Sequence, residues 1–203
     1  MTLDKDKLLD SILASFSRLD YIKSEDIPGI DLYMDQVTTF MDEHLQSARR
    51  HDQDKILTKT MINNYAKNNL LPPPLKKKYS KEHLLVLIFI YYFKGFLSFS
   101  DIQSILNPLT ERFFHTDNTL NMEMLYEEVF SLERNEIEIL KADVKRKYEA
   151  AYATFSDVQE EDSEFLHLFS LICMLSFDVY VKKQLIEKLI DEYQDSHFTS
   201  RKK

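Results

Sequence analysis

The sequence predicts a mainly α-helical protein, on three observations. Apolar residues recur at three- and four-residue steps along most of the 203 residues, which is the period of an amphipathic helix. No stretch of useful length shows the two-residue alternation of a β-strand. Only two glycines, Gly29 and Gly95, are present, too few for the phosphate-binding loops of Walker or dinucleotide-binding proteins. We therefore expect helices, with at most a small β wing around residues 70–79.

Two helices are expected in the first fifty residues. The first ends before Tyr21, and its apolar positions are Leu3, Leu8, Leu9, Ile12, Leu13, Phe16 and Leu19. Pro28-Gly29 marks a turn, because proline fixes one backbone dihedral and glycine permits the next. The second helix runs from Asp31, a good N-cap residue, to about Gln46. Residues 48–54 are polar and aperiodic, which predicts a loop.

The helix that follows is the most sharply defined. Thr58 can cap its start, and Asn69 stands where helices often end in a left-handed residue. Its side chains divide into an inward set, Met61, Ile62 and Tyr65, and an outward set, Lys59, Thr60, Asn63, Asn64 and Lys67. The prolines at 72–74 cannot continue a helix and lead into a lysine-rich loop or strand pair. Ser80 is then a candidate N-cap for an apolar helix that Gly95 closes.

The second half of the chain predicts further helices. Ser100 can cap a short helix that Pro108 stops. Residues 119–155 have apolar positions among many charges, which favours one long exposed helix or two with a bend. An acidic break at 156–163 precedes a helix over 164–194 whose first half is apolar all round. Such a helix must be covered on every side, so we expect it at the centre of a helical domain or in a subunit interface. Its uncharged run is shorter than the roughly 20 residues of a membrane span, and no membrane segment is predicted.

Charge is distributed unevenly along the chain. The net charge is −8, yet the window Lys55–Lys81 contains seven lysines and no acidic residue, which leaves −15 elsewhere. A chain polarised in this way can present one face to a negatively charged partner while the rest stays acidic and soluble. The single cysteine, Cys173, forbids an internal disulfide, as is typical of a reducing compartment such as the cytoplasm.

Catalytic and metal-binding patterns are weak. The six histidines are scattered, and His44 with His51 lacks a third ligand at convincing spacing. Cys173 lies in the most apolar helix, where a thiol is typically an inert packing group. Adjacent acids such as Glu127-Glu128 are most simply exposed charges. We therefore expect no enzymatic activity, no metal and no cofactor.

Three strings follow one another within Ile56–Leu106: LTKTMINNYAKNNLLPP at 57–73, YSKEHL at 79–84 and LSFSDIQSIL at 97–106. In this order they resemble the winged helix-turn-helix of MerR-type transcription regulators. Asn63 and Asn64 stand where that family often has an arginine and a tyrosine, and the usual Gly-Tyr-Arg of its wing is missing. The string over Lys59–Ser80 is more closely similar to an uncharacterised bacterial family with such a module at its centre.

The resemblance implies binding of double-stranded DNA, with a recognition helix at about 58–68 in the major groove and a wing at 75–79 on the phosphates. The residue types suit this, because lysines displace condensed counterions and asparagine pairs with the edge of adenine. The predicted DNA-contacting set is Thr58, Lys59, Thr60, Asn63, Asn64, Tyr65, Lys67, Lys76, Lys77, Lys78 and Tyr79. Two alternatives stay open: Lys76–Lys78 is a solvated turn, and Tyr65 fills the core.

We expect an N-terminal helix and turn at 1–30, a MerR-like winged-helix domain at 31–108 and a C-terminal helical domain at 109–203. The resemblance implies that the C-terminal helices dimerise, and the stripe at 119–155 is the candidate homodimer surface, with a monomeric bundle as the alternative. An aromatic and methionine stripe in the last helix could line an effector pocket but is more often plain core: Phe165, Phe169, Met174, Phe177 and Tyr180.

The predicted function is that of a cytoplasmic, sequence-specific DNA-binding transcriptional regulator. The alternative is a non-enzymatic protein-interaction module that retains the winged-helix fold, because a fold does not fix a function.

Overall fold

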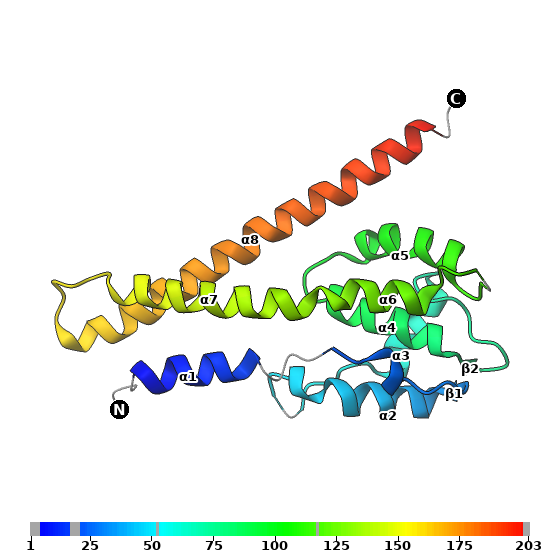
Figure 1. Ribbon diagram of the computed structural model, residues 1–203, viewed down its shortest axis with the longest axis horizontal. Helices are drawn as coiled ribbons and strands as arrows, with labels where there is room; N and C mark the ends of the chain where they lie inside the picture. The colour runs from blue at the N-terminus through cyan, green and yellow to red at the C-terminus, as the bar shows by residue number, and fades with distance from the viewer. Residues whose placement is uncertain (1–4, 17–20, 52, 117, 201–203) are drawn as a thin grey trace. The chain divides into compact units, whose positions relative to one another are not determined.

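The computed structural model describes residues 5–16, 21–51, 53–116 and 118–200, and it is mainly helical, as predicted (Figure 1). The chain forms two compact units: unit 1 consists of residues 1–20 and 132–186, and unit 2 of residues 21–131 and 187–203. This division differs from the predicted boundary at 108. Residues 109–131 belong to unit 2, where the buried hydroxyl of Tyr126 donates a hydrogen bond to the carbonyl of Ile22.

Unit 2 begins with short elements that pair across the sequence. They are a 3-10 turn η1 (Ser24–Asp26), strand β1 (Leu32–Tyr33), helix α2 (Met34–Leu45) and a second 3-10 turn η2 (Gln46–Ala48). Strand β1 runs antiparallel to β2 (Lys78–Tyr79), with Leu32 opposite Tyr79 and Tyr33 opposite Lys78. The expected N-cap at Asp31 is wrong, because pairing with β2 keeps the next two residues extended. Tyr33 caps α2 instead, and its backbone N–H donates to the Gln36 side chain over 2.8 Å.

Helix α4 (Lys81–Phe93) is the core of unit 2. All its side chains from His83 to Ile90 are buried, as expected for a helix without a polar face. The predicted cap is confirmed, because Ser80 donates its backbone N–H to Nδ1 of His83 over 3.0 Å. The sequence suggested that Gly95 ends α4 in a left-handed backbone conformation. This is wrong, because neither glycine has a positive φ.

The elements around α4 are α3 (Lys59–Lys67), which contacts α2, and α5 (Phe99–Phe113) and α6 (Met122–Ser131), which contact α4. Two predictions about α5 are wrong. Its N-cap is Ser98 rather than Ser100, with the N–H of Asp101 donating to Ser98 Oγ over 3.1 Å. Pro108 lies inside the helix. Because Ile102 and Leu106 are buried in the turns before Pro108, tertiary packing outweighs the lost backbone hydrogen bond.

In unit 1, α1 (Lys5–Phe16), α7 (Glu133–Tyr152) and the first part of α8 (Glu160–Ser200) share a small core. That core consists of buried Tyr148, Ala151 and Leu171, with Leu8, Leu9, Ile12, Tyr152, Met174 and Leu175 packed against it. Lys147 of α7 is buried and forms ion pairs with Asp143 and with Asp178 of α8. The segment at 119–155 forms two helices, α6 and α7. The sequence pattern had allowed either one long helix or two.

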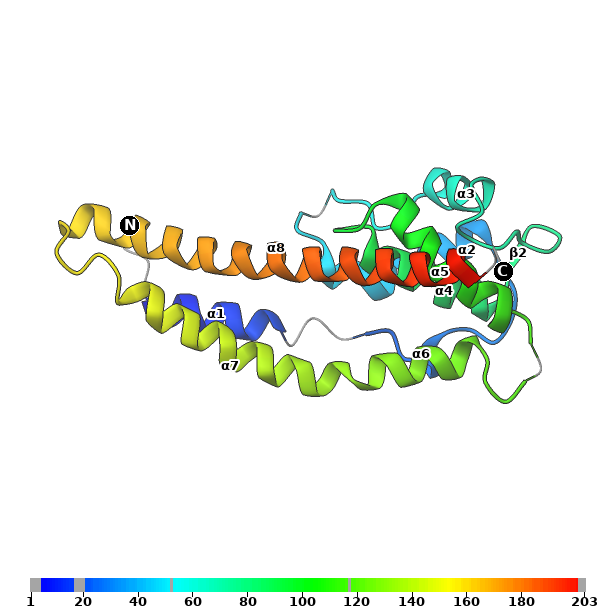
Figure 2. The ribbon, with the colours of Figure 1, turned by 90° about the horizontal axis from the view of Figure 1, so that it is seen from above.

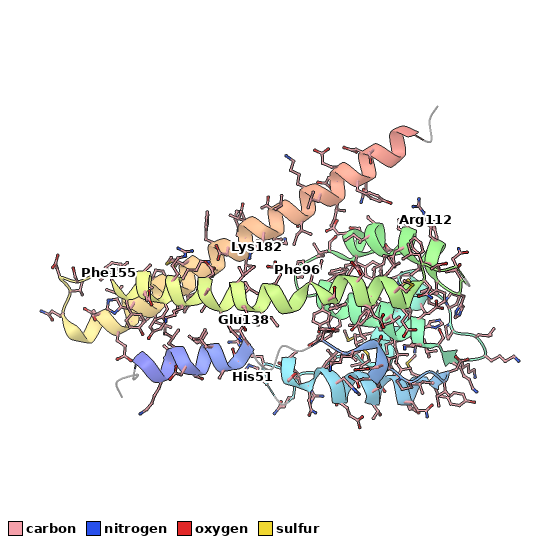
Figure 3. All side chains as sticks on the ribbon, in the orientation of Figure 1. His51, Phe96, Arg112, Glu138, Phe155 and Lys182 are labelled. Carbon is pink, nitrogen blue, oxygen red and sulfur yellow. The ribbon has the colours of Figure 1, made fainter. Side chains whose placement is uncertain are left out.

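Helix α8 differs most from expectation. Its apolar half was expected at the centre of a helical domain or in a subunit interface. The first alternative is wrong, since Phe165, Phe169, Phe177 and Tyr180 are all exposed. Residues 162–196 are long and apolar enough to cross a membrane by length and composition alone, and only 11% of the most apolar window is buried, so this helix is not covered as the core helix of a helical domain would be. The sequence alone did not indicate a segment long enough to span a membrane, because Asp178 interrupts the uncharged apolar run. Figure 3 marks Lys182, near which the helix turns amphipathic.

Candidate nucleic-acid interface

Helix α3 presents a polar face to solvent. Thr58 caps it as predicted, accepting a hydrogen bond at Oγ1 from the N–H of Met61 over 3.2 Å. On one side, Ile62 and Tyr65 are buried. On the other, the exposed residues are Lys59, Thr60, Asn63, Asn64 and Lys67, the outward set that the spacing predicted.

The end of α3 is fixed by a left-handed residue. Asn69 has a φ of 56°, as predicted, and the N–H groups of Leu70 and Leu71 return to the carbonyl of Tyr65 over 2.9 and 3.2 Å. Both leucines are buried, so the chain that leaves the helix is anchored in the core and is not a free loop. The three prolines then carry it extended to residue 75.

The hairpin between residues 75 and 79 turns at two lysines. The N–H of Lys78 donates to the carbonyl of Leu75 over 2.9 Å, and the two residues between them, Lys76 and Lys77, have φ values of 50° and 65°. Positive φ at both central positions is the geometry of a type I′ turn, which favours Asn-Gly. For lysine, each left-handed conformation costs roughly 1 kcal/mol. The sequence therefore has two positively charged lysines at turn positions where the backbone conformation favours Asn and Gly.

The base of the hairpin is anchored to the core. Tyr79 is buried and its ring meets that of His83 edge-on, with 5.4 Å between centroids. Lys78 is half-buried, and its Nζ lies over the ring of Tyr33, 5.2 Å from the centroid. Burial lowers the pKa of His83 to about 4, with a smaller contribution from the nearby His115. The histidine is thus neutral at pH 7 and is part of the support beneath the hairpin.

Unneutralised positive charge lies at the end of α3 and at the hairpin tip. Lys59 forms an ion pair with Asp35, and Lys81 with Glu123. Within the described ranges, Lys67, Lys76 and Lys77 are exposed and form no ion pair. The part of the chain that the structure describes also shows no hydrogen bond from the side-chain amides of Asn63 or Asn64, and both face solvent. Figures 1 and 2 both place α3 and the hairpin at the same end of unit 2.

Two residues do not belong in the predicted contact set. Tyr65 and Tyr79 are buried, so the alternative that Tyr65 fills the core is the correct one, and Tyr79 does the same. Two exposed residues beside the lysines were missed: Leu75 is 71% and Tyr33 is 55% exposed. Their exposure depends on the pairing of β1 with β2, for which the sequence holds no local signal.

No group of three or more His, Cys, Asp or Glu side chains arranged to hold a metal ion occurs among the residues that the structure describes. His44 uses Nδ1 for a 2.9 Å contact with the carbonyl of Phe40, one turn earlier in α2.

The chain was compared with known proteins. A family model described as a domain of unknown function, DUF1836, matches residues 22–129. No curated protein and no solved structure matches. The matched segment begins at Ile22, whose carbonyl accepts a hydrogen bond from Tyr126, and ends within α6, so it covers almost all of the first segment of unit 2. The chain therefore belongs to the DUF1836 family, which fits the predicted similarity to an uncharacterised family.

Proposed function

We propose that unit 2 is a winged helix-turn-helix that binds double-stranded DNA sequence-specifically, and that the chain is a transcriptional regulator of the bacterial cytoplasm. Helix α3 is the recognition helix, and the hairpin at 75–79 is the wing. The observation that carries the proposal is the exposed polar face of α3, at the same end of unit 2 as a turn that holds two lysines in left-handed conformations.

The order of elements supports the winged-helix proposal. Strand β1, helix α2, helix α3 and the hairpin follow one another, and β1 closes the sheet with the returning strand of the hairpin. In helix-turn-helix proteins the first helix crosses the DNA backbone while the second enters the major groove. The connection at 46–58 is longer than the usual three- or four-residue turn. The angle between α2 and α3 is therefore not set by a tight turn, and α2 supports α3 through the contact between the two helices.

The side chains divide between two tasks. Asn63 and Asn64 have unused amides that can pair with the N6 and N7 edge of adenine in the major groove. Lys67, Lys76 and Lys77 have unneutralised charges that can replace counterions on phosphates. Three such contacts in one unit give a slope of log Kobs against log salt of about −2.7, since each contributes about −0.9.

The test is DNA binding by the full chain, measured by fluorescence anisotropy on duplexes selected from a random library. Replacing both asparagines, Asn63→Ala with Asn64→Ala, is expected to cost at least about 30-fold on the selected duplex and little on a scrambled one, because each base contact is worth roughly 1–3 kcal/mol and two are lost. Lys76→Gln with Lys77→Gln is expected to weaken binding to both duplexes alike.

The matched control removes equal charge from exposed lysines elsewhere, as Lys145→Gln with Lys188→Gln. It is expected to leave the salt slope near that of the unmodified chain. Absence of binding at low salt contradicts the proposal. So does an equal loss from the hairpin lysines and from the control lysines, because binding would then follow net charge alone.

The exposed Leu75 favours a second candidate function. Leu75 and Tyr33 are both exposed beside the lysines of the hairpin, and tyrosine is enriched at protein interfaces, so unit 2 could bind an acidic protein surface instead. Leu75→Ser separates the two functions. If DNA is the partner, this variant keeps its DNA affinity and salt slope. If a protein is the partner, a genome-wide crosslinking profile of the unmodified chain shows no focused DNA sites.

A further inference from the structure

One face of α8 in unit 1 is apolar and open to solvent. Five of its residues are exposed: Phe165 by 67%, Phe169 by 51%, Ile172 by 51%, Val179 by 63% and Tyr180 by 61%. At 100° per residue they fall within an arc of about 100°. The residues that join the core of unit 1, such as Leu171, lie outside this arc. We call these five residues the outer face of α8.

The outer face has the area that a stable dimer requires. An aromatic side chain buries roughly 150–250 Å². If the smaller Ile172 and Val179 are counted at the same size, the exposed fractions above amount to at most about 440–730 Å². A standard interface buries roughly 800 Å² per partner, of which a little over half is apolar. The largest apolar patch on an ordinary monomer reaches about 300–600 Å² and is often functional. One helix face therefore supplies the apolar part of a complete interface.

The charges around α8 argue against a lipid bilayer as the occupant. The opposite side of α8 is bound to α7 through the Lys147–Asp178 ion pair, and α7 brings Lys141, Asp143, Lys145, Arg146, Lys147 and Glu149 with it. A membrane-spanning α8 would drag these charges into hydrocarbon. Attachment to the membrane surface is also disfavoured, because interfacial helices are rich in Lys and Arg, whereas residues 157–164 contain five acidic residues and no basic one.

We propose that the outer face of α8 binds the same face of a second copy of this chain, forming a two-fold helix-to-helix interface. Between Phe165 and Val181 the only Asp, Glu, Lys or Arg is Asp178, which is engaged by Lys147. An uncharged face is self-complementary and meets itself without like-charge repulsion. The surface differs from the stripe at 119–155, in which Val144 and Tyr148 are already buried inside unit 1.

The proposal concerns unit 1 and does not depend on DNA binding, so its test uses the full chain without DNA. Mass is measured by light scattering and by sedimentation equilibrium from about 1 to 100 μM. The 24.1 kDa chain is expected to run at twice its mass. Ile172→Glu puts a charge at the centre of the face in both copies and is expected to weaken dimerisation at least about 100-fold.

The matched control is Leu185→Glu. Leu185 is also an exposed aliphatic residue of α8, but it lies about 140° around the helix from Ile172. The control is expected to stay dimeric, and circular dichroism is expected to show equal helix content in both variants. A monomeric unmodified chain at 100 μM overturns the proposal, as does equal disruption by both substitutions. Flotation of the monomer with phosphatidylglycerol and phosphatidylcholine vesicles would overturn it in favour of a bilayer.

Discussion

Replacing the two lysines at the hairpin tip, Lys76→Asn with Lys77→Gly, is expected to make the protein more stable and a weaker DNA binder. Both residues occupy the left-handed region, at roughly 1 kcal/mol each for lysine. Asparagine tolerates that region, and glycine enters it freely but gives back about 0.5–1 kcal/mol through greater freedom in the unfolded chain. The net gain is about 1 kcal/mol. At a urea m-value of roughly 1–3 kcal/mol/M, the unfolding midpoint should rise by about 0.3–1 M.

The same substitution removes two of the three unneutralised lysines, so the salt slope of DNA binding should fall in magnitude by about 1.8. Urea unfolding followed by circular dichroism measures the first effect, and anisotropy at four salt concentrations measures the second. Lys76→Gln with Lys77→Gln separates them, since it removes the charge but keeps the strained backbone. A fall in stability on introducing Asn-Gly would refute the turn geometry. An unchanged salt slope would refute the role of the lysines.

Three further predictions concern stability. His83 has a pKa of about 4 in the folded protein, against about 6.5 when unfolded. Its contribution to the free energy of unfolding is therefore fully present above pH 6.5 and is lost as the pH falls toward 4, by about 3 kcal/mol. In His83→Gln, the free energy of unfolding should vary less with pH between 6.5 and 4, as measured by urea denaturation. Thr58→Ala should cost about 1 kcal/mol by removing the α3 cap, and Thr58→Ser should restore it; urea midpoints decide. Leu171→Ala should cost about 2–5 kcal/mol and lower the melting temperature of unit 1, while a loss below 0.5 kcal/mol would show that α8 does not need this contact.

Local signals in the sequence predict much of α3 and its surroundings. Thr58, Asn69 and Ser80 act within three or four residues of themselves, through one hydrogen bond or one backbone angle each. Spacing alone separated exposed Asn63 from buried Ile62. These features were predictable because no distant part of the chain competes with them.

The features that were missed depend on distant contacts. Strand β1 has two residues and exists only through its partner 46 positions later, so Asp31 alone resembled a cap. Pro108 stays helical because the core holds the helix on its N-terminal side. In the candidate site, the burial of Tyr79 follows from the same strand pairing. The sequence could not reveal which apolar residues of α8 meet another helix of the same chain.

Between His83 and Ile90, helix α4 has no side that faces solvent, and this affects how unit 2 moves. Its amides between His83 and Ile90 are surrounded by apolar side chains, so their hydrogens can exchange with solvent only when unit 2 opens as a whole. Helix α3 and the hairpin touch the rest of the unit on one side each, and their amides exchange through small local openings. The surface proposed to meet DNA can therefore adjust its shape on a fixed frame, without any loosening of the centre.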